Sequence, residues 1–254
     1  MTILCYHAVQ QHWTSPLAID PSVFEAQASW LARRRTVVPL STAVERLDGR
    51  GRLPRGMAAL TFDDGLQSVH QHAWPVLRRL RLPATVFLVA ETLSPEGRAV
   101  DWVDTPPPYP LQTLTLDEVL EMQSEGVSFA SHSYSHLDLP SLGHEECVTD
   151  LRRSRELLED LLKMSVPYLA YPRGRHNAGV RAAAAEAGYS RSFTLPQGKE
   201  SFDAHAIPRV GIFQGNGKAT LVAKTDPSYL GFRMSPAFSI LRSAAAGLGA
   251  PPRP

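Results

Sequence analysis

The stretch MAALTFDDG (residues 57–65) decides how this chain folds. Its first six residues are apolar or β-prone and are typical of a buried strand. That strand runs directly into Asp63, Asp64 and Gly65. Two carboxylates at the end of a buried strand are costly unless they are paired or bound to a metal ion. A helix cap followed by a turn explains the same residues without any chemistry, and at this point both interpretations stay open.

On either side of this stretch, β-rich apolar runs alternate with helical patterns. Strands are expected at 2–9, 36–40, 57–62, 84–89, 127–131, 167–171, 191–194 and 206–213. Helices are expected at 22–34, 41–47, 67–80, 144–164 and 177–187, with one more between Thr115 and Gly126. Such alternation is typical of α/β folds with a mainly parallel sheet. About seven strands suit a closed or nearly closed barrel in a single domain, and a doubly wound open sheet is the alternative.

Composition narrows the class of protein. The chain has 254 residues, a net charge of +1 and 43% hydrophobic residues, so a disordered chain is excluded. Near-zero charge gives no electrostatic reason to expect nucleic acid as a partner. Residues 1–19 lack charge but have neither a basic leader nor the length of a membrane span. We therefore expect no transmembrane segment and a cytoplasmic protein, which could work at the inner face of the membrane.

The expected domain covers residues 1–225, followed at 226–254 by a C-terminal helix and a disordered tail. Two cysteines far apart, Cys5 and Cys147, do not suggest a disulfide framework. The long Pro-rich segment 92–113 is typical of a functional lid. Within it, Trp102 could cover a sugar ring or simply pack inside the loop.

Two further segments follow predicted strands. In SHSYSH (131–136), His132 and His136 lie four residues apart, which on a helical turn would place both rings on one side, near a single metal ion. In YLAYPRG (168–174), Pro172 and Gly174 set a tight turn. Taken singly, the first pattern is often incidental and the second is often only a turn. Their shared position matters because parallel α/β folds bind ligands at the carboxyl ends of strands.

In this order and spacing, the three motifs resemble those of the polysaccharide deacetylase family (carbohydrate esterase family 4, the chitooligosaccharide deacetylase homology domain). TFDDG (61–65) and HSYSH (132–136) resemble its first two motifs, and YPRG (171–174) looks like a variant of its third. The resemblance implies a distorted (β/α) barrel and a metal-dependent deacetylase. By motif position, the metal ligands would be Asp64, His132 and His136, and the general base would be Asp63. The backbone N–H of Tyr171 would help to bind the oxyanion, in a turn shaped by Pro172 and Gly174.

The sequence departs from the family pattern in two places. The late Leu-x-x-His motif, which supplies the general acid, is absent, and the third motif lacks its leading arginine. Arg209, near the carboxyl end of the last strand, could pair with Asp63 instead. His7 shares its strand face with Cys5 and could face the barrel mouth, or it could be a satisfied buried histidine. His205 fits an exposed loop better than an acid.

The resulting hypothesis is a metal-dependent enzyme that hydrolyses an N-acetyl group from an acetylated carbohydrate. Its cofactor would be one divalent ion, zinc first, with cobalt, manganese or nickel as alternatives. An amide hydrolase for a small non-sugar substrate is one alternative function, and a non-catalytic sugar-binding protein is another. The Asp63–Asp64 pair argues against a pure binder, since binding needs no base. Nothing in the sequence predicts the oligomeric state.

Overall fold

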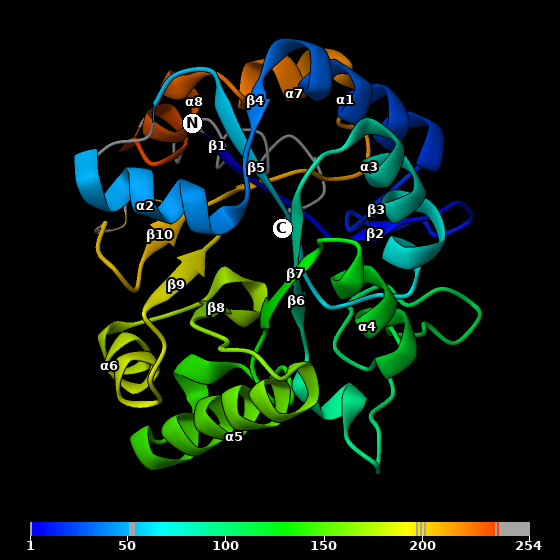
Figure 1. Cartoon of the computed structure of the whole chain (residues 1–254). Coiled ribbons are helices and arrows are strands. Elements are labelled where there is room, and N and C mark those ends of the chain that lie inside the picture. Colours follow the sequence, from blue (N-terminus) through cyan, green and yellow to red (C-terminus); the bar gives the residue numbers. More distant parts are fainter. Residues whose placement is uncertain are drawn as a thin grey trace.

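A nearly closed barrel of parallel strands forms the centre of the single domain in a computed structural model (Figure 1). The structure describes residues 2–50, 54–196, 198, 200, 202–236 and 238. Eight strands follow one another around the barrel in the order β10-β9-β8-β7-β6-β5-β1-β11. Their bounds are β1 Thr2–Tyr6, β5 Met57–Phe62, β6 Ala84–Leu88, β7 Ser128–Ser131, β8 Tyr168–Ala170, β9 Arg191–Thr194, β10 Ile207–Pro208 and β11 Val210–Gly211. The prediction of a distorted parallel barrel is confirmed, and the open-sheet alternative is wrong.

The barrel closes at a single residue. Strands β10 and β11 stand at the two ends of the sheet order, yet only Arg209 separates them in the chain. Strand β10 pairs with β9, where the Arg209 N–H donates to Thr194 O, and β11 pairs with β1. The strand expected at 206–213 is thus split in two at Arg209. The barrel therefore has eight strands where about seven were expected.

Helices cover the outside of the barrel (Figure 1). They are α1 Pro21–Arg34, α2 Leu40–Arg50, α3 Trp74–Leu80, α4 Leu116–Ser124, α5 His144–Leu162, α6 Ala178–Glu186, α7 Lys218–Lys224 and α8 Pro227–Arg233. Short helical turns lie at η1 Val69–Ala73, η2 Ala90–Leu93, η3 Leu139–Ser141 and η4 Pro172–Gly174, and short strands at β2 Ala8–Val9, β3 Ala18–Ile19 and β4 Thr36–Val37. None of the described helices is long and apolar enough to cross a membrane.

Alternation along the strands decides what fills the barrel. Ile3, Ala59, Phe87 and Phe193 point inward and pack with the apolar face of α2, which closes the amino end of the barrel. Two positions further along β1 and β5, the inward places belong to Cys5 and to Thr61, and the polar groups begin there. The core thus changes from apolar to polar toward the carboxyl ends of the strands.

The last described helix lies against the domain. Tyr229 and Leu230 of α8 pack against the main hydrophobic core between sheet and helices. A C-terminal helix is therefore present in the segment expected to carry one. The tail expected at 245–254 lies outside the described residues, and the boundary after residue 225 stays a prediction.

Candidate active site

Asp63 sits at the carboxyl end of β5 inside the barrel, where the residue is 1% exposed. Arg209 holds it through two hydrogen bonds, Nη1 to Oδ1 and Nη2 to Oδ2, both 2.7 Å long. The same Nη1 donates to Thr61 Oγ1, and the guanidinium lies over the Phe87 ring. The structure thus brings Arg209 and Asp63 together in the bidentate geometry that a lysine cannot copy.

Because this ion pair is buried, the pKa values of both partners differ from those of a solvent-exposed pair. Burial alone would raise the pKa of Asp63, but the charge and hydrogen bonds of Arg209 outweigh it and hold that pKa well below its usual range. Burial would lower the pKa of Arg209, and the Asp63 carboxylate raises it further than burial lowers it. Asp63 is therefore a carboxylate at neutral pH, with its orientation fixed.

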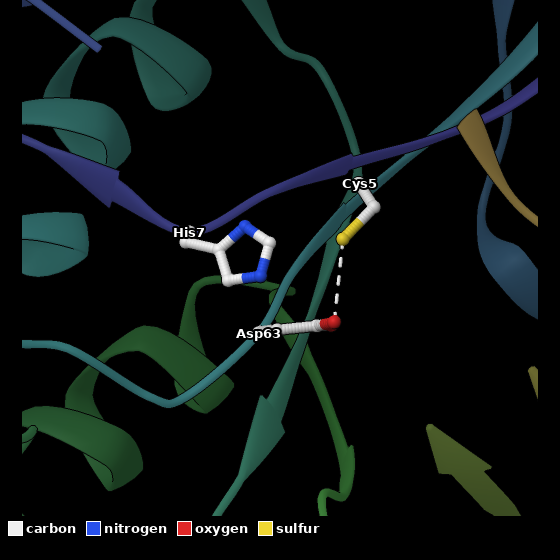
Figure 2. Close-up of side chains that lie close together, drawn as sticks. All are labelled: Cys5, His7 and Asp63. Carbon is white, nitrogen blue, oxygen red and sulfur yellow. Dashed lines mark hydrogen bonds between the residues drawn. The ribbon is translucent and has the colours of Figure 1, made fainter. Parts of the chain in front are cut away.

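Cys5 and His7 approach the same carboxylate from β1 and the residue that follows it (Figure 2). The Cys5 thiol donates to Asp63 Oδ2 at 3.2 Å, and one ligand atom of each of the three residues lies within 4.8 Å of the other two. Such a trio could hold a metal ion in principle. Here Arg209 already occupies both Asp63 oxygens, and burial raises the pKa of the Cys5 thiol, which opposes the thiolate. The trio is therefore better described as polar side chains gathered around the Asp63–Arg209 ion pair than as a metal site.

Asp64 turns the opposite way from its neighbour. Its φ of 69° and the φ of 60° at Gly65 make the chain turn sharply after the strand, as expected from the glycine. A Cβ on Gly65 would lie 2.8 Å from a Leu88 methyl group, and together with the positive φ this contact favours glycine at the turn. Adjacent residues that would face opposite sides of an ideal strand therefore reach one site.

Asp64, His132 and His136 form a second buried cluster, with ligand atoms within 4.8 Å of one another. Asp64 Oδ1 lies 3.5 Å from His132 Nε2 and 3.4 Å from His136 Nε2. Burial would raise the pKa of Asp64, but His136 outweighs it and lowers that pKa to about 2. Burial lowers the pKa of His132 to about 4, so this ring is neutral at pH 7.

These residues fit a divalent metal ion. His132 Nδ1 lies 2.8 Å from Ala170 O, and because a carbonyl only accepts, Nδ1 carries the proton. The neutral ring then aims the lone pair of Nε2 at a carboxylate oxygen. Two electron-rich atoms that face each other across 3.5 Å are an arrangement that a cation between them stabilises. Two imidazoles and a carboxylate also leave positions open for water and substrate.

The histidine loop is not the helical turn that the spacing suggested. Residues 132–136 lie outside any helix, with left-handed φ angles of 69° at Ser133 and 54° at His136. Asp150 of α5 holds the loop by accepting from the Tyr134 and Ser135 N–H groups and from the Ser135 hydroxyl. The two histidines meet because of this buried carboxylate, and helical spacing plays no part.

The third motif forms a tight turn after β8. The Tyr171 N–H donates to Phe193 O at 3.1 Å, so it is engaged in backbone pairing, which argues against its predicted oxyanion role. Pro172 is buried and has no N–H. Gly174 is required, since its φ is 67° and a Cβ there would lie 2.6 Å from Leu195 N. The N–H of Arg173, between them, makes no backbone hydrogen bond to another described residue.

Two other predicted positions have clear surroundings. Trp102 is 8% exposed, donates its indole N–H to Asp64 and stacks on His136, so little of its ring is free to cover a sugar. His205 precedes β10 and therefore lies at the amino end of the barrel, where it bonds Ser192. It therefore lies at the opposite end of the barrel from Asp63 and Asp64, which follow the carboxyl end of β5.

Sequence reasoning missed three residues of this site. Cys5 shares the inward strand face with Ile3 and His7, which was a usable signal. Asp150 is an acid within the apolar stripe of α5, between Cys147 and Leu151, and a buried acid in such a stripe needs partners. Arg173 binds the lid through long-range contacts, and no local pattern indicates them.

Comparisons with known proteins identify the family to which this chain belongs. The family model described as "Polysaccharide deacetylase" matches residues 50–192. A relative from Bacillus subtilis (strain 168), "Putative polysaccharide deacetylase YxkH", is 26% identical over 85% of this chain and 72% of its own length. "Poly-beta-1,6-N-acetyl-D-glucosamine N-deacetylase" of Staphylococcus aureus is 22% identical over 71% of this chain, which spans only 62% of that enzyme.

Solved structures show the same fold. The Streptococcus pyogenes deacetylase PplD, in complex with acetate, superposes with a TM-score of 0.75 at 23% identity, over 89% of this chain and 98% of that one. IcaB from Ammonifex degensii superposes with a TM-score of 0.74 at 25% identity, over 88% and 96%. With more than half of its residues matched by the family model, this chain belongs to the polysaccharide deacetylase family.

Proposed function

We propose that this protein is a metal-dependent hydrolase that removes N-acetyl groups from an acetylated sugar polymer. The observation that carries the proposal is the contrast between two adjacent buried carboxylates. Asp63 is clamped by Arg209, and Asp64 faces two imidazoles. A general base and a metal ligand are thus separated by one peptide bond. The named deacetylase relatives support the acetylated sugar as substrate.

The metal site would consist of Asp64, His132 and His136. A divalent ion there, zinc for preference with cobalt, manganese or nickel as alternatives, would polarise the acetyl carbonyl and lower the pKa of water. His132 is fixed by Ala170 O, and Asp150 fixes the loop that carries both rings. The protein therefore supplies a site whose ligands need little rearrangement.

Asp63 would accept the proton of the attacking water. It is ionised at neutral pH, and Arg209 prevents its rotation, so a proton acceptor always faces the site. The cost is basicity, because the same guanidinium that fixes the carboxylate lowers its pKa.

His7 would donate the proton that the leaving nitrogen needs when the C–N bond breaks. Its ring lies beside Asp63, and its buried Nδ1 has no hydrogen-bond partner in the described part of the chain (Figure 2). A buried polar atom without a partner at a reacting site is consistent with a partner that arrives with the substrate. The oxyanion would bind the N–H of Arg173, which the turn at 172–174 leaves unused.

The polymer itself would extend along the His7 side of the site. A cavity of about 480 Å³ lies there, lined by residues 10–14, 18–20, 23 and 214–217. One wall continues the chain from His7, and another continues from Phe213, which stacks on the His7 ring. Three of its amide side chains, Gln10, Gln11 and Gln214, suit sugar hydroxyls.

The test measures acetate released from β-1,6-linked N-acetylglucosamine oligomers by the zinc-loaded protein. We expect turnover that a chelator abolishes and zinc restores, and faster turnover on a pentamer than on the monomer. Turnover only on small non-sugar acetamides would assign the amide-hydrolase alternative. Oligomer binding without acetate release under any of the four metals would leave a sugar-binding protein and overturn the proposal.

A further inference from the structure

The loop between η2 and α4 reaches over the predicted metal ligands and places one tryptophan among them. The Trp102 indole N–H donates to Asp64 Oδ1 at 3.2 Å. The same ring stacks on His136, with centroids 5.0 Å apart and planes at 23°. Trp102 thus touches two members of the three-residue cluster, one by a hydrogen bond and the other by its face.

Trp102 donates to the carboxylate oxygen that faces both imidazoles. Asp64 Oδ1 is also the atom nearest to Nε2 of His132 and of His136. A donor on that oxygen fixes the rotation of the carboxylate, just as Ala170 O fixes the ring of His132. Groups that orient metal ligands in this way typically change metal affinity by about 10–100-fold when they are removed.

The loop that carries Trp102 is fastened from two sides. Arg173 of the third motif donates through Nη2 to Trp102 O at 2.8 Å and through Nη1 to Asp104 Oδ1 at 2.9 Å. Arg98 lies over the Trp102 ring and bonds Glu91 and Asp101 within the loop region. The turn expected to bind the oxyanion is therefore tied directly to the loop that orients a metal ligand.

We propose that Trp102 is a positioning residue of the metal centre and that Arg173 is the latch that keeps it in place. This inference rests on the proposed metal site. Trp102 sets how tightly the metal is held, because it fixes Asp64 and supports His136. Arg173 sets how fast the metal exchanges, because the loop must loosen before Asp64 can swing away from the cluster.

The decisive variant is Trp102→Phe, which keeps an aromatic ring against His136 and removes only the N–H donor. Trp74→Phe is the matched control, because Trp74 is equally buried and also stacks on a histidine, His70, at 5.0 Å and 28°. Zinc affinity is measured by competition with a chromophoric chelator. We expect a 10–100-fold loss for Trp102→Phe and less than threefold for Trp74→Phe.

The latch is tested through kinetics. Zinc transfer to excess EDTA is followed for Arg173→Gln and for Asp104→Ala, which removes only the exposed end of the latch. We expect release to be several-fold faster in Arg173→Gln and less affected in Asp104→Ala. These two variants also decide the matter should Trp102→Phe fail to fold, since unchanged release in both overturns the latch.

The outcomes separate this inference from the proposed function. A folded Trp102→Phe protein with wild-type zinc affinity would make Trp102 a packing residue and overturn the positioning role, whatever the activity. A mere packing role would lower the melting temperature and leave zinc affinity unmoved. Failure of the wild-type protein to bind one equivalent of zinc or another of the four metals would instead remove the metal site itself.

Discussion

Asp63 and Asp64 are neighbours in the chain but belong to differently built regions. Among the described residues, the side chain of Asp63 hydrogen-bonds to groups of the barrel: Cys5 from β1, and Arg209 from the junction of β10 and β11. The partners of Asp64 come from loops: the histidine loop after β7 and the lid after η2. The proposed base is thus fixed by the sheet, and the proposed metal ligand is fixed by loops. Changes in the barrel core should therefore alter turnover and its pH dependence through Asp63. Changes in the loops should alter metal binding through Asp64.

The largest effect should come from the loop-built side. His132→Ala or His136→Ala removes one of three ligands, so we expect the metal to be lost and turnover to fall to background while the fold survives. Elemental analysis and circular dichroism check the two halves of this statement. A variant that retains one equivalent of metal would show that the ligand assignment is wrong.

Removing the base should cost somewhat less. Asp63→Asn keeps shape and hydrogen-bonding capacity but cannot take a proton, so turnover should drop by about 10²–10⁴-fold. Metal content should not change. Loss of the metal would instead show that the roles are reversed, with Asp63 as the metal ligand and Asp64 as the base.

Arg209→Lys tests the barrel-built side through pH. The guanidinium holds the pKa of Asp63 below its usual range, so a single-point contact from lysine should let that pKa rise. The base works only when ionised, so the acidic limb of the pH–rate profile should move to higher pH. The pH at which the protein loses stability in acid should also move to higher pH. An Asp whose pKa is depressed in the folded state stabilises the fold above its unfolded-state pKa, and this contribution is lost as pH falls through the folded-state pKa.

Metal retention is the internal control for this variant. An acidic limb at its wild-type position, in a folded and metal-loaded Arg209→Lys protein, would mean that Arg209 stabilises the barrel without tuning the base.

The smallest effect concerns the thiol beside the base. Cys5 is fully buried and its pKa is raised by burial, and burial raises the pKa of Cys147 to about 11. Iodoacetamide at pH 8 should therefore label neither cysteine in the native protein and both after unfolding. Labelling of Cys5 in the native state would show that the barrel interior opens as readily as the loops do.

The same contrast explains what the sequence could reveal. Strand alternation placed Asp63, His7 and Arg209 near one another, because period-2 patterns and the carboxyl-end rule are local information. The histidine pair was found from its spacing, but its loop geometry depends on Asp150, which lies on another element. The hydrogen bond from the Tyr171 N–H to Phe193 O could not be predicted, because Phe193 lies on β9 and the turn sequence does not indicate that pairing.

The position of Arg209 between β10 and β11 also has a consequence for folding. Arg209 joins the two edge strands of the sheet, and β11 must find β1, its partner from the opposite end of the chain, before the guanidinium can reach Asp63. Contacts between such distant segments form slowly, and the N-terminal part of a chain leaves the ribosome first. On the proposed assignment of Asp63 as the base, a chain cut short before β11 would therefore lack the pairing that brings Arg209 to its base.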